Sequence, residues 1–322
     1  MKVGIIGAGK IAIKMADTLN GMADAEAYAV ASRNIEKAES FAKEHHVTKA
    51  YGSYEVMLRD ENVDLVYIAT PNTCHFEQAK LCISYKKPVL CEKPFTANAK
   101  QTKELLEYAK QENVFIAEAI WTRYMPSRQM INDIIASGEK GEVSSLTANL
   151  GYKLDWKERV MAPELAGGAL LDIGIYPLNF ASMVFGNDIA SMTSSCVKTE
   201  TGVDAQDTIV LTYKDGKVAT LYTTIRAITD QYGIVYGSKG FLIAYNINNV
   251  TKIAIFGADR SLVREVEVPE QITGFEYEVA SCKRAVEAGE LECPEMPHSE
   301  TIKMMEWMDA LRAEWGVRYP FE

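Results

Sequence analysis

The sequence predicts an α/β domain followed by an α+β domain, and two observations support this prediction. The chain has 322 residues, which suits two domains of ordinary size. Its first 120 residues alternate short apolar runs with amphipathic stretches, whereas the later residues form a succession of short strands separated by turns. We therefore expect the domains to span residues 1–121 and 122–322.

The apolar runs of the first domain predict the strands of a parallel sheet. They are short, rich in Val, Ile, Leu or Ala, and do not alternate with polar residues, which is typical of strands buried on both faces. The amphipathic stretches between them predict helices that cover the sheet. The expected strands are 3–6, 27–31, 64–70, 88–91 and 114–119, and the expected helices are 11–20, 35–45, 53–59, 73–84 and 99–112.

The second domain is expected to hold a mostly antiparallel sheet, because its strands follow one another as a meander. The dipeptide Asp215-Gly216 between two of them is typical of a hairpin turn. The expected strands are 143–151, 191–198, 208–213, 218–225, 233–236, 241–245, 252–256 and 263–268, and the expected helices are 127–137, 168–185, 275–288 and 300–315.

The composition excludes several classes of function. The chain carries 44 acidic and 34 basic residues, a net charge of −10, so neither nucleic acid nor an anionic membrane is expected as a partner. No apolar run approaches the roughly 20 residues that span a bilayer, and the N-terminus lacks a signal-peptide pattern. The six cysteines form no CxxC pair and no cluster with histidine, so we expect reduced thiols, no metal site and a cytoplasmic protein.

A glycine turn follows the first expected strand. Residues 7–12 read Gly-Ala-Gly-Lys-Ile-Ala, which is the pattern G-x-G-x-x-A between a strand and a helix. Gly7 permits the tight turn, Gly9 lets a pyrophosphate approach the backbone, and Ala12 lets the helix pack close to the strand. Free N–H groups at the start of the helix suit the phosphates. The turn therefore predicts a dinucleotide site that includes Gly7, Gly9, Lys10, Ile11 and Ala12.

The end of the second expected strand indicates the kind of dinucleotide. An NAD site usually carries Asp or Glu here, to bind the ribose 2′-hydroxyl, but this chain has Ser32 and Arg33. A hydroxyl and a guanidinium suit a 2′-phosphate, and Lys37 adds a second positive charge one helical turn later. We therefore expect NADP as the cofactor, with NAD as the alternative. The other interpretation of Arg33 and Lys37 is that they are solvated surface residues.

Two further groups of residues carry chemistry. Glu92-Lys93-Pro94 follows a later strand of the first domain, and open α/β sheets bind their ligands at this end of the strands, within reach of a nicotinamide. Asp172 and Tyr176 are four residues apart in an apolar expected helix that begins after Gly167-Gly168, so they share one face. Polar side chains buried in such a segment need a partner or a function. For Tyr176 alone, core packing with a satisfied hydroxyl is the alternative.

Together these motifs resemble the glucose–fructose oxidoreductase, inositol dehydrogenase and MocA family. Within that family the chain is particularly similar to the branch of dimeric dihydrodiol dehydrogenases and D-xylose (NADP) dehydrogenases. The resemblance covers essentially the whole chain, in order. It is carried by residues 7–12, 69–72 with His75, 92–94, 118–123, 167–177, 274–278, 315–316 and 319–320.

The resemblance implies a Rossmann domain and a second domain with an open-faced, mostly antiparallel sheet. Because that sheet often forms the oligomer interface, we expect a homo-oligomer, in the first place a dimer. The resemblance also implies that Lys93, Asp172 and Tyr176 lie at the catalytic centre, and that Trp121 and Phe275 form aromatic walls for the substrate. Many relatives carry histidine in place of Tyr176. The further cofactor-binding residues that it implies are Ala69, Thr70, Pro71, Asn72, His75, Glu92, Lys93, Trp121 and Arg123.

The expected reaction is hydride transfer between NADP and a hydroxyl-bearing carbon of a sugar, polyol or cyclic diol. Tyr176 is our first choice for the acid/base, because a nearby Lys93 ammonium would favour its ionised form. Lys93 would also bind the substrate oxygen, and Asp172 would orient the substrate or Lys93. The alternative is that Lys93 itself is the base. Two other functions remain open at this point: a cofactor-binding sensor without turnover, and a double-bond reductase on the same fold.

Overall fold

The computed structural model describes residues 1–322, which divide into two compact units. The first unit holds Met1–Tyr124 and Gln271–Met305, and the second holds Met125–Glu270 and Glu306–Glu322. The boundary expected between residues 121 and 122 stays a prediction. The six cysteines are all free thiols, and four of them are buried.

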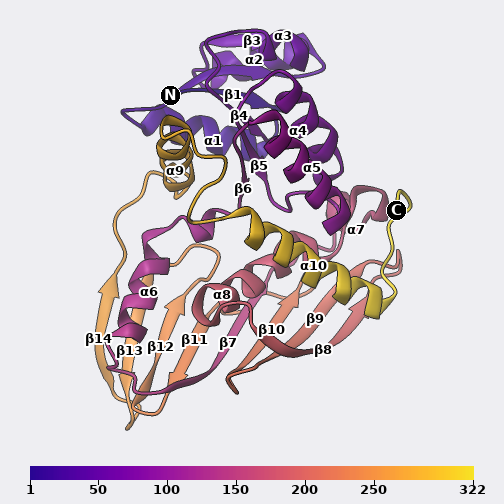
Figure 1. The fold of residues 1–322 in the computed structure, drawn as a ribbon. Helices are drawn as coiled ribbons and strands as arrows, with labels where there is room; N and C mark the ends of the chain where they lie inside the picture. Colours follow the sequence, from indigo (N-terminus) through magenta and orange to yellow (C-terminus); the bar gives the residue numbers. More distant parts are fainter. The chain divides into compact units, whose positions relative to one another are not determined.

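The first unit is built on a six-stranded parallel sheet with the order β3-β2-β1-β4-β5-β6. This is the strand order of a Rossmann domain, which confirms the expected fold class. Figure 1 shows α4 and α5 side by side against the sheet. The strands are β1 (Lys2–Ile6), β2 (Glu26–Ala31), β3 (Lys49–Tyr51), β4 (Leu65–Ile68), β5 (Val89–Glu92) and β6 (Ile116–Ala119).

The helices of this unit cover a core of aliphatic side chains. Almost every residue of β1, β4, β5 and β6 is buried, because helices pack against both faces of the parallel sheet. The helices are α1 (Lys10–Gly21), α2 (Ile35–Glu44), α3 (Tyr54–Leu58), η1 (Asn72–Cys74), α4 (His75–Ser84), α5 (Ala99–Glu112), η2 (Trp121–Arg123) and α9 (Glu276–Glu287). The long helix α10 (His298–Trp315) begins in this unit and ends in the second.

The second unit is built on an eight-stranded sheet with the order β14-β13-β12-β11-β7-β10-β9-β8. All neighbouring pairs are antiparallel except β7 with β10, which confirms the expected mostly antiparallel sheet. The Asp215-Gly216 turn joins β9 to β10, with Gly216 at φ +87°. The strands are β7 (Val143–Gly151), β8 (Ile189–Lys198), β9 (Asp204–Tyr213), β10 (Val218–Thr224), β11 (Gly233–Gly237), β12 (Gly240–Tyr245), β13 (Lys252–Gly257) and β14 (Leu262–Glu267).

Helices cover one face of this sheet. α6 and α8 lie on the same side of it in Figure 1, and α8 packs on β7 and β10. Along β9 and β12, buried residues alternate with more exposed ones, as expected when only one face is packed. The helical elements of this unit are α6 (Pro126–Ala136), α7 (Glu158–Met161), η3 (Pro163–Leu165), η4 (Leu170–Gly174) and α8 (Ile175–Phe185).

One helical stretch, Pro163–Phe185, is long and apolar enough in length and composition to cross a membrane. This corrects the expectation that no stretch approaches a bilayer span, because η3, η4 and α8 follow one another and together are mostly apolar despite Glu164 and Asp172. Within the unit, 83% of its most apolar window is buried. That is the position of a core helix, whose apolar side chains face other protein elements on all sides.

Candidate functional site

The turn after β1 has the geometry of a phosphate cradle. Gly7 has φ +103°, its N–H donates to the Ala31 carbonyl at 3.0 Å, and a Cβ there would lie 3.0 Å from the Ala69 carbonyl oxygen. Gly9 is the residue that precedes the first turn of α1, and a Cβ on it would meet no atom within 4 Å. No side chain caps α1, and its first turn has no acidic residue. The space beside Gly9 and the uncapped N–H groups therefore fit a dinucleotide pyrophosphate.

The loop after β2 presents positive charge to solvent. Asn34 caps α2 by accepting from the Lys37 N–H at 2.8 Å, and the Ser32 hydroxyl oxygen accepts from the Asn34 N–H at 3.3 Å. Arg33 and Lys37 are exposed, and neither forms an ion pair with an acidic side chain. These contacts fix the backbone and leave both cations available, which suits a ribose 2′-phosphate.

His75 joins two loops at the carboxyl ends of the strands. It is 1% exposed, and its ring nitrogens lie 2.9 Å from the Pro94 and Thr70 carbonyl oxygens. Burial lowers the pKa of His75 despite these bonds. Both ring nitrogens are therefore occupied by backbone, and His75 links the loop after β4 to the Glu92-Lys93-Pro94 segment. On the same loop, Ala69 is buried, Pro71 is exposed and Asn72 is half-buried.

Glu92 holds the backbone from which Lys93 projects. Its carboxylate accepts from the Tyr67 hydroxyl, by a short bond, and from the Lys93 N–H at 3.1 Å. Burial raises the pKa of Glu92, while the Tyr67 bond and the Lys93 charge oppose that rise. Lys93 itself is half-buried. The strand end thus fixes the start of the Lys93 side chain, as a reacting or orienting amine requires.

Arg123 is buried in an ion pair. It is 2% exposed, and its guanidinium donates to Glu300 at 2.8 Å. Nearby Glu118 is 1% exposed and accepts from the Phe95 N–H at 3.2 Å. Burial raises the pKa of Glu118 to about 7. In this structure Arg123 and Glu118 therefore brace the loops that flank Lys93, rather than presenting charge to solvent.

Trp121 and Phe275 are brought together and enclose a lysine. Their rings meet edge to face at 4.9 Å, and the Lys14 ammonium lies 4.2 Å from each ring centroid. Trp121 is 6% and Phe275 4% exposed. Burial lowers the pKa of Lys14, and the charges of Glu278, Glu92 and Glu276 partly compensate. Sequence reasoning missed Lys14, although it lies four residues after Lys10 on the same face of α1.

In the second unit, the segment before Asp172 is shaped by a buried carboxylate. Gly168 has φ +122°, and a Cβ there would lie 2.2 Å from an Asp204 oxygen. The other Asp204 oxygen accepts from the Leu170 N–H at 2.5 Å, and the Tyr319 hydroxyl donates to the Gly167 carbonyl at 2.9 Å. Asp204 thus takes the place of a helix cap, and only glycine leaves room for it.

The segment that carries Asp172 and Tyr176 is not one continuous α-helix, which corrects the expected helix 168–185. Residues Leu170–Gly174 form a π-helical turn, and α8 begins at Ile175. Pro177 has no N–H and cannot donate to the Ile173 carbonyl, as a continuous α-helix requires. Such π turns are frequent at functional sites. Tyr176 is 7% exposed, and the side chain of Asp172 is 12% exposed.

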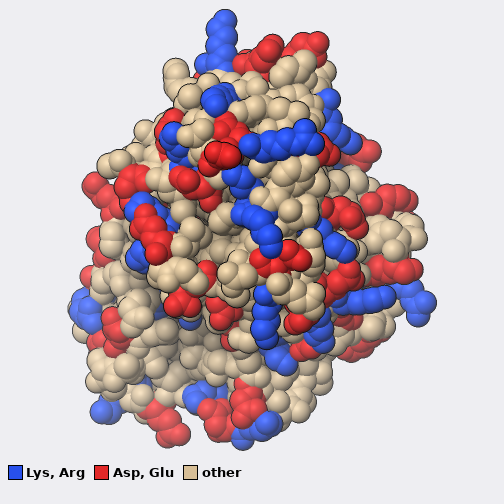
Figure 2. Space-filling view, turned by 45° about the horizontal axis from the view of Figure 1, so that its top comes forward, with Lys and Arg blue, Asp and Glu red and all other residues tan.

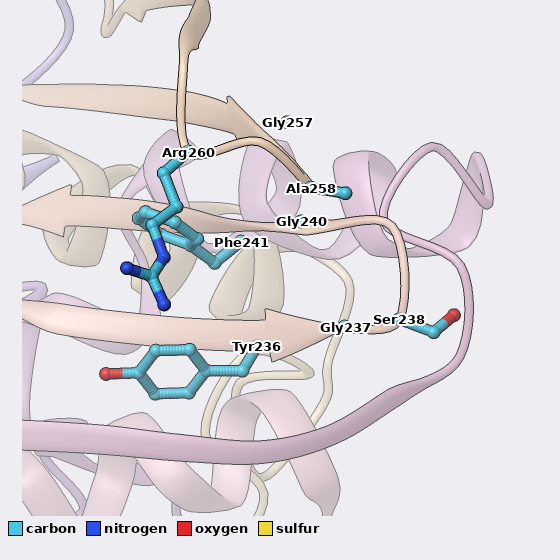
Figure 3. Close-up of a pocket in the computed structure, with 8 residues that line it drawn as sticks. All are labelled: Tyr236, Gly237, Ser238, Gly240, Phe241, Gly257, Ala258 and Arg260. Carbon is cyan, nitrogen blue, oxygen red and sulfur yellow. The ribbon is translucent and has the colours of Figure 1, made fainter.

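The second unit has a surface pocket that none of these residues lines. Its volume is about 330 Å³, and it is at the β11–β12 hairpin of the second unit. Figure 3 shows Arg260 extended across the sheet toward Tyr236, next to Phe241. No residue that the sequence singled out lines this pocket. On the face of the molecule in Figure 2, acidic and basic side chains are interspersed, with no large patch of one sign.

Two family models match the chain. One is described as an oxidoreductase family with an NAD-binding Rossmann fold and matches residues 1–119. The other is the GFO/IDH/MocA C-terminal domain and matches residues 129–243. The first match covers the phosphate cradle and Lys93, and the second covers Asp172 and Tyr176.

The chain is also similar to several characterised proteins. It is 33% identical over 327 residues to trans-1,2-dihydrobenzene-1,2-diol dehydrogenase of Xenopus tropicalis, which covers 99% of each chain. The human protein of the same name is 32% identical over 329 residues, covering 99% of this chain and 98% of the relative. Among solved structures, the 3-ketoreductase KijD10 of Actinomadura kijaniata with NADP and TDP-benzene has a TM-score of 0.88 at 24% identity, with 97% of each chain covered. Levoglucosan dehydrogenase with NADH and L-sorbose has a TM-score of 0.86 at 18% identity, covering 98% of this chain and 97% of that one.

The contact between Asp204 and Gly168 predicts that Gly168 tolerates substitution poorly. We expect Gly168→Ala to cost roughly 2–4 kcal/mol in the free energy of unfolding, because the strained φ and the displaced Asp204 add together. Gly202→Ala is the matched control, since Gly202 has φ +90° but open space around its Cβ position. Urea unfolding measures both variants. Equal losses in the two would show that the Asp204 contact adds nothing.

The burial of Glu118 predicts a pH dependence of stability. Its pKa in the folded chain, about 7, lies above the unfolded value, so its contribution is fully present at low pH and is lost as the pH rises through 7. Between pH 6 and pH 8, wild type should lose roughly 1 kcal/mol relative to Glu118→Gln, which cannot ionise. Urea midpoints at both pH values test this, with the exposed Glu39→Gln as control. Parallel pH profiles of wild type and Glu118→Gln would contradict it.

Proposed function

The chain belongs to the GFO/IDH/MocA oxidoreductase family, and from this premise we propose that it is an NADP-dependent dehydrogenase of a cyclic diol, polyol or sugar. Membership makes it an NAD(P)-dependent oxidoreductase acting on CH–OH groups. The observation that carries the proposal is the empty space beside Gly9 at the uncapped start of α1, at the same strand edge as Lys93. The N–H groups at the start of α1 beside Gly9 would hold the pyrophosphate of a dinucleotide, and the bound cofactor would supply a hydride carrier at this strand edge.

The substrate class is supported by the relatives rather than by a shaped pocket. Proteins that share 33% and 32% identity over nearly the whole chain are named as dehydrogenases of trans-1,2-dihydrobenzene-1,2-diol. A vicinal hydroxyl pair on a ring is common to that compound and to many sugars and polyols. We therefore propose a ring-borne secondary alcohol as the reacting group, and a panel of a trans-dihydrodiol, D-xylose, D-glucose and myo-inositol as the test.

The reaction needs one hydride acceptor and one proton acceptor. Bound NADP supplies the hydride acceptor for the carbinol carbon. In our proposal the Tyr176 phenolate accepts the proton of the substrate hydroxyl as the carbonyl forms. The Lys93 ammonium donates a hydrogen bond to the substrate oxygen and favours the ionised Tyr176, and Asp172 orients these groups. In the alternative, Lys93 is the base that accepts the proton, and Tyr176 donates the hydrogen bond to the substrate oxygen.

Two other functions are distinguished by the same assay. A sensor would bind NADP without turning over any member of the panel. A double-bond reductase would deliver a labelled hydride to an alkene carbon instead of a carbonyl carbon. The presence of Lys93, Asp172 and Tyr176 together favours the dehydrogenase, because a sensor has no need of an acid/base pair.

We also propose a homodimer and a cytoplasmic location, with no membrane or nucleic acid partner. The uncovered sheet face carries partly exposed aromatic side chains, and the Phe241 and Phe256 rings stack at 4.7 Å with an angle of 9°. Such a face suits burial against a second copy of the chain. The net charge of −10 supports the absence of a nucleic acid partner.

The cofactor assignment predicts the effect of removing Arg33. We expect wild type to prefer NADP over NAD in kcat/KM, and Arg33→Ala to raise the KM for NADP roughly 10–100-fold through the lost charged hydrogen bonds. The KM for NAD should change little, because NAD has no 2′-phosphate. The exposed Arg59→Ala is the control for lost surface charge. A wild-type preference for NAD would refute the assignment.

The catalytic assignment predicts two slow variants. Tyr176→Phe and Lys93→Met should each lower kcat by about 10²–10⁴-fold, the usual effect of a lost acid/base group. NADP binding, followed by fluorescence titration, should persist in Tyr176→Phe. Tyr108→Phe and Lys110→Met remove the same chemical groups from α5 and serve as controls. Near-normal turnover in either catalytic variant would remove that residue from its role.

A further inference from the structure

Asp172 is held by a residue that the sequence did not single out. The Arg159 guanidinium donates to both carboxylate oxygens, at 2.8 and 3.1 Å. This two-point geometry fixes the plane of the carboxylate as well as its position. The side chain of Arg159 is 52% exposed and that of Asp172 is 12% exposed. The carboxylate is therefore the desolvated partner, and it depends on the guanidinium for compensation.

The backbone around Arg159 is tied to the same glycine pair that precedes Asp172. The Gly168 N–H donates to the Val160 carbonyl at 2.8 Å, and the Gly167 N–H donates to the Ala162 carbonyl at 3.0 Å. Val160 is fully buried and anchors the short helix α7. Arg159 and Asp172 thus project from two segments that are hydrogen-bonded to each other. The local fold therefore holds the two-point bond in place.

Arg159 also acts on Tyr176. Burial lowers the pKa of Arg159, but the bond to Asp172 and the charges of Asp172 and Tyr176 raise it more, so the guanidinium stays charged. A fixed positive charge within range of a tyrosine favours the ionised form of that tyrosine. The same guanidinium therefore binds Asp172 directly and acts on Tyr176 through its charge.

We propose that Arg159 is a positioning residue of the reaction, which orients the Asp172 carboxylate through a two-point bond. This inference rests on the proposed function and deepens it, because it assigns the orientation of Asp172 to a residue outside the helix that carries it. Lysine cannot replace Arg159, because an ammonium donates from a single point and does not match the two carboxylate oxygens.

The test compares Arg159→Ala, Arg159→Lys and Asp172→Asn with wild type on the substrate that wild type turns over. We expect Arg159→Ala to lower kcat roughly 10–100-fold, as expected for a lost charged two-point bond, with the dissociation constant of NADP unchanged within twofold. Arg159→Lys should retain only a small part of the kcat that Arg159→Ala loses. Added guanidinium ion, at millimolar concentrations well below denaturing ones, should restore activity of Arg159→Ala several-fold. Methylammonium and sodium chloride at equal concentration are the controls.

The combined variant Arg159→Ala/Asp172→Asn separates positioning from a general loss of structure. If Arg159 acts through Asp172, the combined variant is no slower than the slower single variant. The proposal would be overturned if the losses in kcat of the two single variants multiplied in the combined variant. It would also be overturned by a kcat of Arg159→Ala within twofold of wild type, or by equal rescue with methylammonium. A wild-type chain that binds NADP and turns over no substrate refutes the proposed function, and the role of Arg159 falls with it. The urea stabilities of wild type, Arg159→Ala, Asp172→Asn and the combined variant then report the ion pair alone, so the two failures are distinguishable.

Discussion

The parallel pairing of β1 between β2 and β4 is the constraint on which the cofactor site depends. Because parallel strands end at one edge, the loops after β1, β2 and β4 meet there. Two backbone bonds fix their register: the Gly7 N–H donates to Ala31, and the Ala69 N–H donates to Ile6. A side chain at Gly7 would crowd the Ala69 carbonyl and would be strained at φ +103°, so the close approach of these loops favours glycine.

Three buried carboxyl groups lie near the same edge. Glu92, Glu118 and Glu278 are all nearly inaccessible to solvent, and burial raises the pKa of each. Neither oxygen of Glu278 has a hydrogen-bond partner, so the Lys14 ammonium is its main compensation. Replacing such groups by apolar ones often stabilises a protein. Their arrangement around the ends of β5 and β6 is therefore better explained by the orientation they impose on Lys93 and on the Trp121–Phe275 pair than by stability.

The sequence predicted the elements whose signal is local, and it failed where the cause is distant. Strand β7 lies at the residues where it was expected, and the G-x-G-x-x-A turn lies between a strand and a helix as expected. Strand β3 was missed, because it has only three residues, one exposed and two half-buried, and no apolar run. Residues 271–305 belong to the first unit, and the local pattern of apolar residues does not indicate this. Arg159 was missed for a related reason: an isolated arginine in a polar stretch indicates a solvated surface until the partner, Asp172, is seen.

Three departures from ideal structure in the second unit meet at the segment that leads to Tyr176. Between Gly167 and Tyr176 the chain accepts a positive φ at Gly168, a π-helical turn and a buried carboxylate, Asp204, whose burial raises its pKa. Each of these features costs free energy that a plain α-helix would not, and such violations are expected at functional sites. The two-point bond from Arg159 adds a constraint on the plane of the Asp172 carboxylate, so the fixed backbone and the ion pair act together on the orientation of this residue.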